Sequence, residues 1–142
     1  MKKTLALTTL LFAGTLLFAA DAPRWTVFQS GKITAKNPLR VEGSAGETLK
    51  AVGSTCALTG FIPGEKAHVS FLARGKGTLE GMVWGKKMKR TNIRRLPLTS
   101  DWTEFRLDFA VPEDETALSL SVFFWDQQDV HFELKDLVVK AK

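Results

Sequence analysis

A repeated two-residue alternation of apolar and polar side chains is the feature that most constrains the fold of this chain. It is clearest in LSLSVFFW (118–125), where Leu118, Leu120, Val122 and Phe124 occupy every second position. Successive side chains of a β-strand point to opposite faces, whereas a helix repeats its apolar residues every three or four positions. No stretch after residue 22 keeps the helical spacing, so the sequence predicts an all-β chain.

Eight segments carry the alternation, five of them strongly. The strong ones are 67–74, 78–84, 103–111, 118–125 and 131–139, and the weaker ones are 25–30, 38–43 and 48–53. Turn-forming residues separate several of them, at 63–65, 75–77, 98–101, 112–115 and 126–129. Short strands joined by such turns predict an antiparallel β-sandwich, and periodicity alone leaves jelly-roll and immunoglobulin-like topologies both open.

The first 20 residues have the character of a secretory signal peptide. Lys2 and Lys3 precede an uncharged run that ends in small residues at Ala19, Ala20 and Ala22. The alternative is a membrane anchor, but a run of about 17 residues is at the lower limit for spanning a bilayer. We therefore expect residues 1–20 to be cleaved after export by the Sec route, although the cleaved bond stays open. Residues 21–142 would form one domain in the periplasm or outside the cell, with no transmembrane anchor.

The cysteine count and the net charge limit what kind of exported protein this can be. Cys56 is the only cysteine, so an internal disulfide is excluded, and its apolar surroundings predict a buried side chain. The chain carries 20 basic and 15 acidic side chains, a formal charge of +5, and the two lysines of the leader account for part of that excess. The mature protein is therefore only mildly basic.

The basic residues gather in one run, GKKMKRTNIRR (85–95), whereas acidic residues dominate 101–136. A local cationic run can bind an anionic partner such as an acidic glycan or an anionic lipid. Export argues against nucleic acid, and the alternative is a solvated loop balanced by the acidic segment. The candidate anion-binding residues are Lys86, Lys87, Lys89 and Arg90.

Catalytic groups are sparse. The two histidines, His68 and His131, alternate with core positions and are expected at the surface, and no serine lies in a nucleophile-elbow pattern. No close pair of histidines or cysteines suggests zinc. We expect a non-catalytic protein, with a glycosidase built on two facing carboxylates as a more distant alternative.

Residues 58–139 resemble the β-jelly-roll carbohydrate-binding modules of families four, nine, sixteen and twenty-two. The resemblance is carried in order by GFIPGEKAHVSFLARGKG, a strand ending in Trp84, LTSDWTEFRLDFAVP, LSLSVFFW and HFELKDLVVK. It implies a jelly-roll sandwich and a carbohydrate ligand. It also assigns Trp102 and Phe105 to packing positions, and we expect Trp25 to close an edge of the sandwich.

The family's structural calcium site is not expected here. Asp136 occupies the acidic position of the closing strand, but the chain begins DAPRWTVFQS in place of the family's glycine-rich phrase and its acid. One carboxylate supplies too few of the oxygen ligands that calcium takes. We therefore expect no cofactor and no metal.

Sugar rings lie on flat apolar surfaces, and their hydroxyls bind planar polar groups. The chain has no tyrosine, so stacking falls to aromatic residues that face away from the expected core: Trp84, Phe123 and Trp125. Polar candidates beside them are Glu80, Asp126, Gln127 and Gln128. The alternative is that these aromatic residues are buried, because an inverted strand phase would turn them inward.

Two hypotheses result. The first is an exported, non-catalytic carbohydrate-binding protein whose polysaccharide or oligosaccharide ligand, neutral or acidic, stacks on tryptophans of one sheet face. The second is a periplasmic or cell-surface sandwich that binds a protein partner or is structural, with no sugar ligand. The second predicts buried tryptophans and a flat polar exterior.

Overall fold

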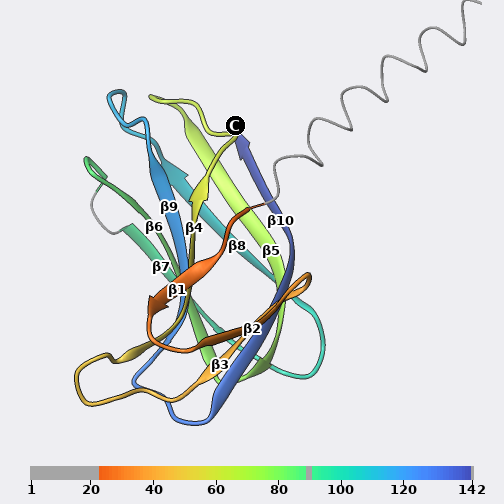
Figure 1. Cartoon of the computed structure of the whole chain (residues 1–142). Coiled ribbons are helices and arrows are strands. Elements are labelled where there is room, and N and C mark those ends of the chain that lie inside the picture. The colour runs from red at the N-terminus through yellow and green to blue at the C-terminus, as the bar shows by residue number, and fades with distance from the viewer. Residues whose placement is uncertain (1–22, 89–90, 142) are drawn as a thin grey trace, which may run out of the picture.

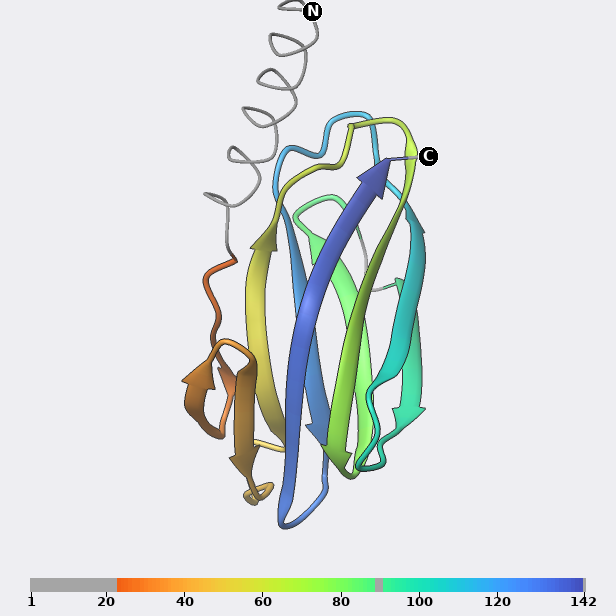
Figure 2. The ribbon, with the colours of Figure 1, turned by 90° about the vertical axis from the view of Figure 1, so that its right-hand side faces the viewer.

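The computed structural model describes residues 23–88 and 91–141 and shows a sandwich of two five-stranded sheets (Figures 1 and 2). All strand pairs within the sheets are antiparallel, which confirms the all-β sandwich expected from the sequence. The expected leader, residues 1–20, lies outside the described residues, as do Lys89 and Arg90. The described part of the chain contains no helix long and apolar enough to cross a membrane.

Each sheet draws its strands from along the whole domain. The first sheet has the order β1 (Thr26–Gln29), β4 (Ala51–Leu58), β9 (Leu118–Trp125), β6 (Thr78–Gly85) and β7 (Thr91–Pro97). The second sheet has the order β2 (Lys32–Lys36), β3 (Leu39–Gly43), β10 (Val130–Ala141), β5 (Lys66–Lys76) and β8 (Thr103–Ala110). Without the two N-terminal strands, the first sheet has the order β4-β9-β6-β7 and the second has the order β3-β10-β5-β8. This arrangement of eight strands is that of a jelly roll.

The core lies between the sheets and is built from the residues that the alternation assigns inward. Phe124 of β9 and Phe132 of β10 meet across the two layers with ring centroids 5.7 Å apart. The ring of Phe105 lies over Gly81 of the opposite sheet, where a Cβ atom would come within 2.7 Å of Cζ. Burial of each such side chain contributes about 1.5–3 kcal/mol, so this layer supplies much of the folding energy.

Two strands, β2 and β7, were not expected from the sequence. Strand β7 occupies the second half of the basic run, so a fully solvated loop over 85–95 is wrong. Both strands lie at a sheet edge, where only one neighbour is needed and charged side chains are common. KITAK alternates, but it is five residues long and offers only Ile33 and Ala35 as apolar positions, and adjacent arginines interrupt the alternation in TNIRRLP. Each strand still packs one partly buried side chain, Ile33 or Leu96, against the core.

Trp102 lies outside the core, contrary to the expectation. It shares the outward parity of Glu104 and Arg106, whereas Phe105 has the opposite parity and is buried. On the outer face of the second sheet the guanidinium of Arg74 lies 4.4 Å from the Trp102 ring centroid, and the Lys135 ammonium lies 4.3 Å from it. Trp25, by contrast, is buried in the core.

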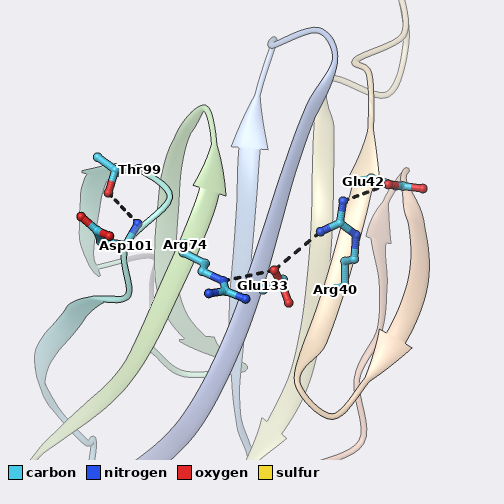
Figure 3. Close-up of polar contacts among 6 residues, drawn as sticks. All are labelled: Arg40, Glu42, Arg74, Thr99, Asp101 and Glu133. Carbon is cyan, nitrogen blue, oxygen red and sulfur yellow. Dashed lines mark hydrogen bonds and ion pairs between the residues drawn. The ribbon is translucent and has the colours of Figure 1, made fainter.

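The outer face of the second sheet is covered by paired charges. Figure 3 shows Glu133 between two arginines, with its Oε1 atom 3.2 Å from Nε of Arg74 and 3.7 Å from a terminal nitrogen of Arg40. Arg40 also lies 3.6 Å from Glu42. Beside this face, the main-chain N–H of Asp101 donates to Oγ1 of Thr99 and orders the turn before β8.

Candidate functional site

A cleft of about 680 Å³ is hollowed into the outer face of the first sheet. Its walls and floor come from strands β1, β6, β7 and β9 and from the turn after β6. The residues that line it are Phe28, Gln29, Glu80, Met82, Trp84, Gly85, Lys86, Met88, Arg95, Phe123 and Trp125.

One row of residues crosses the sheet beneath this cleft. Strand register places Phe28 opposite Gly53, Gly53 opposite Phe123, and Phe123 opposite Glu80. Arg95 of the edge strand completes the row opposite Glu80. Because Gly53 has no side chain, the rings of Phe28 and Phe123 meet above it, with centroids 5.3 Å apart. The row therefore runs from an aromatic end to a charged end.

The floor is apolar and buried. Ala51, Met82 and Phe123 form a cluster separate from the core between the sheets, and Phe28 packs against it. Phe123 is only 6% exposed. It therefore forms part of the floor, and too little of its ring is exposed for a sugar to stack on it. The first sheet thus buries apolar side chains on both of its faces.

Trp84 is fixed by a chain of hydrogen bonds. Its indole Nε1–H donates to Oγ of Ser121 at 2.9 Å, and the Ser121 hydroxyl donates to Oγ1 of Thr55 at 3.1 Å. The Thr55 hydroxyl in turn donates to the main-chain oxygen of Leu120. The indole N–H is therefore satisfied within the protein, and the side chain, 36% exposed, offers the cleft an apolar surface. Ser121 and Thr55 had no role in the sequence analysis, because an outward serine or threonine in a strand is unremarkable.

Trp125 lines the other end of the cleft and is 50% exposed. It lies opposite Ala51, whereas Trp84 lies opposite Ser119, six residues earlier on β9. At about 3.4 Å per residue, the two main-chain rows are about 20 Å apart along the strands. The Trp84 indole leans toward Trp125 as far as Ser121, two residues along β9. The two exposed indoles therefore mark the ends of an elongated site.

The charged end of the row combines a shielded acid with an exposed base. The Glu80 side chain is 11% exposed, and its Oε1 atom lies 3.5 Å from Nε of Arg95, whose side chain is 74% exposed. Lys86 adds a second cation to the lining. On the aromatic side, the Gln29 side chain accepts a hydrogen bond from the main-chain N–H of Ala51.

The turn after β6 is held by a buried carboxylate that the sequence analysis did not single out. Oε2 of Glu115, a residue 2% exposed, accepts hydrogen bonds from the main-chain N–H groups of Lys87 and Met88 at 2.7 and 3.1 Å. The bond from the Lys87 main chain is the main cause that lowers the pKa of Glu115. This carboxylate fixes the segment that carries Lys86 and Met88 into the cleft.

Lys87, a predicted anion-binding residue, is engaged elsewhere. Its ammonium lies 3.0 Å from the Asp114 carboxylate and donates the hydrogen bond that chiefly lowers the pKa of that carboxyl. Lys86 is thus the one of the four predicted anion-binding residues that the described structure brings to the cleft.

Three predicted polar residues hold the turn after β9 and are absent from the cleft lining. Asp126 pairs with Lys50 at 3.5 Å, and the Gln127 amide exchanges two hydrogen bonds with the main chain of Thr78. Gln128 donates to the main-chain oxygen of Ala45. Their placement differs from the expectation because the chain turns at Asp126, where φ is +56°.

Groups for other chemistry do not gather elsewhere in the described residues. Within residues 23–88 and 91–141, no group of three or more His, Cys, Asp or Glu side chains could hold a metal ion. Asp136 is exposed in an irregularity of β10 with φ +57°. Cys56 is 3% exposed, as expected, and burial raises the pKa of its thiol to about 12.

The fold is that of a class of small β-sandwiches, the carbohydrate-binding modules. A family 4 module aligns with 83% of this chain and 86% of its own at TM-score 0.61 and 14% identity. A family 61 module in complex with β-1,4-galactotriose aligns over 86% and 90% at TM-score 0.56 and 11% identity.

A third similar structure is part of a larger protein. A Clostridium thermocellum endo-1,4-β-D-xylanase, determined as its CBM22-1 and GH10 modules in complex with xylohexaose, aligns at TM-score 0.55 and 16% identity. The alignment includes 84% of this chain but only 24% of the xylanase chain. No protein-family model matches the sequence. No curated protein matches it either. At these identities the likeness concerns the fold, which is that of carbohydrate-binding modules.

Proposed function

We propose that this protein is an exported, non-catalytic carbohydrate-binding protein. In this proposal a glycan chain lies along the cleft of the first sheet and stacks on Trp84 and Trp125. The observation that carries it is the placement of two exposed indoles at the ends of one elongated cleft with a buried aromatic floor.

The chemistry of the cleft suits a sugar. The C–H faces of pyranose rings pack on indole rings, and Trp84 has its N–H already satisfied, so its surface is free for such packing. The carboxylate of Glu80 can accept hydrogen bonds from hydroxyl groups, while Arg95 and Lys86 can donate them. An apolar pocket with a few polar groups is the usual form of a small-ligand site.

The fold adds support by analogy. The family 61 module was determined in complex with β-1,4-galactotriose, so this architecture accommodates an oligosaccharide in that protein. Fold alone does not define function, and the proposal therefore rests on the cleft and takes the analogy as secondary.

The rival hypotheses fit the cleft less well. A purely structural sandwich would bury its tryptophans, whereas Trp84 is 36% and Trp125 50% exposed. A glycosidase needs two carboxylates that flank the scissile bond, and among the described residues Glu80 is the one carboxylate that lines the cleft. Export is proposed from the leader-like residues 1–20 alone.

The test is isothermal titration of the mature protein with oligosaccharides from neutral and acidic plant and bacterial polysaccharides. We expect binding that weakens about tenfold in Trp84→Ala and in Trp125→Ala, which corresponds to about 1.4 kcal/mol of lost stacking. Trp102→Ala is the matched control, because it removes an indole from the opposite sheet, and it should bind like the wild type.

Two outcomes would contradict the proposal. One is the absence of binding to any oligosaccharide in the panel by a folded protein. The other is equal weakening in all three tryptophan variants, which would place the binding surface outside the cleft or indicate a general loss of structure. Urea unfolding midpoints for the three variants separate these readings.

A further inference from the structure

We propose that the glycan bound by this cleft carries carboxylates, as uronic acid residues do, and that Arg95 together with Lys86 binds them. The inference rests on the proposed function and names the substrate class of the same site. It starts from the charges of the cleft: Lys86 and Arg95 are cationic, and Glu80 is the one anion among the described lining residues.

Glu80 does not cancel both cations. It is nearly buried on the floor, and its contact with Arg95 is through the Nε edge of the guanidinium at 3.5 Å. The Arg95 side chain is 74% exposed, so most of its guanidinium is open to solvent. The cleft as a whole therefore keeps a net positive charge, and Arg95 presents an accessible guanidinium.

The guanidinium is suited to a carboxylate in particular. Its planar fork of N–H donors matches the two oxygens of a carboxylate, and such paired bonds are among the stronger hydrogen bonds in proteins. Lys86 contributes a compact second charge from the turn that Glu115 fixes. Arg95 is positioned by its place opposite Glu80 in the strand ladder, so both cations have defined positions around the cleft.

The basic residues next to Lys86 and Arg95 in the sequence do not line the cleft. Lys87 is bound to Asp114. Arg94 follows the opposite parity on β7, lies opposite Gly81 and does not line the cleft, although it is exposed. A charge-matched control for Arg95 is thus its immediate neighbour on the same strand.

The experiment uses titration of the mature protein with three probes: hexamers of galacturonic acid, the same hexamers after chemical reduction of their carboxylates to alcohols, and sulfated dextran oligomers. We expect the uronate hexamer to bind about tenfold more tightly than its reduced form at low salt. This preference should decrease with added salt, because exposed charges are screened. Dextran sulfate distinguishes carboxylate recognition from general attraction to anions.

Four variants locate the effect. Arg95→Gln and Lys86→Gln should each reduce the preference for the uronate over its reduced form, whereas Arg94→Gln, with the same change in net charge, should leave it unchanged. Arg95→Lys should lose most of the preference while it keeps the charge, because an ammonium lacks the fork. Arg95→Lys and Lys86→Gln also leave Glu80 with a cationic neighbour, so the test survives if Arg95→Gln fails to fold.

Distinct results overturn the inference and the proposed function. Equal affinity for the uronate hexamer and its reduced form, with both lost in Trp84→Ala, would refute carboxylate recognition and retain a glycan site. If Arg94→Gln lost as much of the preference for the uronate hexamer as Arg95→Gln, carboxylate recognition by Arg95 would be refuted in favour of general attraction between opposite charges. The same conclusion would follow if dextran sulfate bound most tightly of the three probes. Absence of binding to every oligosaccharide, charged or neutral, would instead refute the proposed function.

Discussion

Gly53 is the residue on which the cleft floor most directly depends. It faces the cleft between Phe28 and Phe123, and a Cβ atom there would meet the main-chain oxygen of Val122 and come within 2.5 Å of Cβ of Phe123. The strands β4 and β9 can pair this closely only because the residue lacks a side chain. A single methyl group would therefore push the two strands apart beneath the aromatic floor.

We expect Gly53→Ala to lower the free energy of unfolding by about 1–3 kcal/mol, the range typical of overpacking. The measurement is equilibrium unfolding in urea. Gly46→Ala is the matched control, because its added Cβ would meet nothing nearer than the Leu49 main-chain oxygen at 3.7 Å, an ordinary contact. If the two variants were equally stable, the close approach at Gly53 would not be the constraint described.

The alternation of side chains between the two faces of a strand determines which residue positions could be predicted from the sequence. The alternation placed Trp84 and Trp125 on the outer face from sequence alone, and the structure brings both to the same cleft. It could not show that Phe123 would be covered, because the depth of the cleft depends on Phe28, which comes from a distant strand. For Trp102 the family resemblance predicted a packing position, but its parity with Glu104 corresponds to the outer face on which it lies.

The turn between β6 and β7 is the element that brings Lys86 and Met88 to the cleft, beyond Trp84 along β6. Its main chain is held from outside by Glu115, in the connection between β8 and β9. The sequence did not indicate this contact, because an acid in the PEDE turn reads as a solvated residue. The sequence also did not indicate β2 and β7, because each contributes little apolar surface: Ile33 of the short KITAK and Leu96 of TNIRRLP are the side chains described as packed on the core.

Glu115 makes the stability of the protein depend on pH. Its folded pKa is lowered, so its contribution is fully present above the ordinary glutamate pKa of about 4.3 and is lost as pH falls through the lower folded value. We expect Glu115→Gln to be less stable than the wild type at pH 7, and the difference in unfolding free energy to shrink as the pH falls below about 4.

The check is urea unfolding of both proteins across this pH range. Glu113→Gln is a suitable control, because Glu113 is an exposed acid in the same connection. A difference between wild type and Glu115→Gln that stays constant with pH would mean that the charge of this carboxylate is unimportant. The loss should be accompanied by weaker glycan binding, since Lys86 lies on the turn that Glu115 holds.

At the scale of the whole molecule, the two sheets present two outer faces, and these faces carry different kinds of side chain. The first sheet carries the cleft, whereas the second carries the row of paired charges around Glu133. The sequence predicted the sandwich because inward alternation must be buried somewhere. It could not choose the binding face, since that depends on which strands become neighbours.

Export is a property of the whole chain and is tested as such. We expect the full chain, expressed in a bacterial host, to appear in the exported fraction with a new N-terminus near residues 20–23, as determined by mass spectrometry. Leu11→Arg, which places a charge in the apolar run, should remain uncleaved inside the cell. Wild-type protein that kept residues 1–20 in the same fraction as this variant would contradict the proposed export.

The four tryptophans also give the molecule an optical property. With no tyrosine in the chain, the near-ultraviolet emission comes from indoles, and the four indoles lie in three different settings. Trp25 is enclosed in the core and Trp102 lies beneath two cations, whereas Trp84 and Trp125 face the cleft. A ligand that covered the cleft would change the emission of the second pair against a constant background from the first. Occupancy could therefore be followed by intrinsic fluorescence without any attached label.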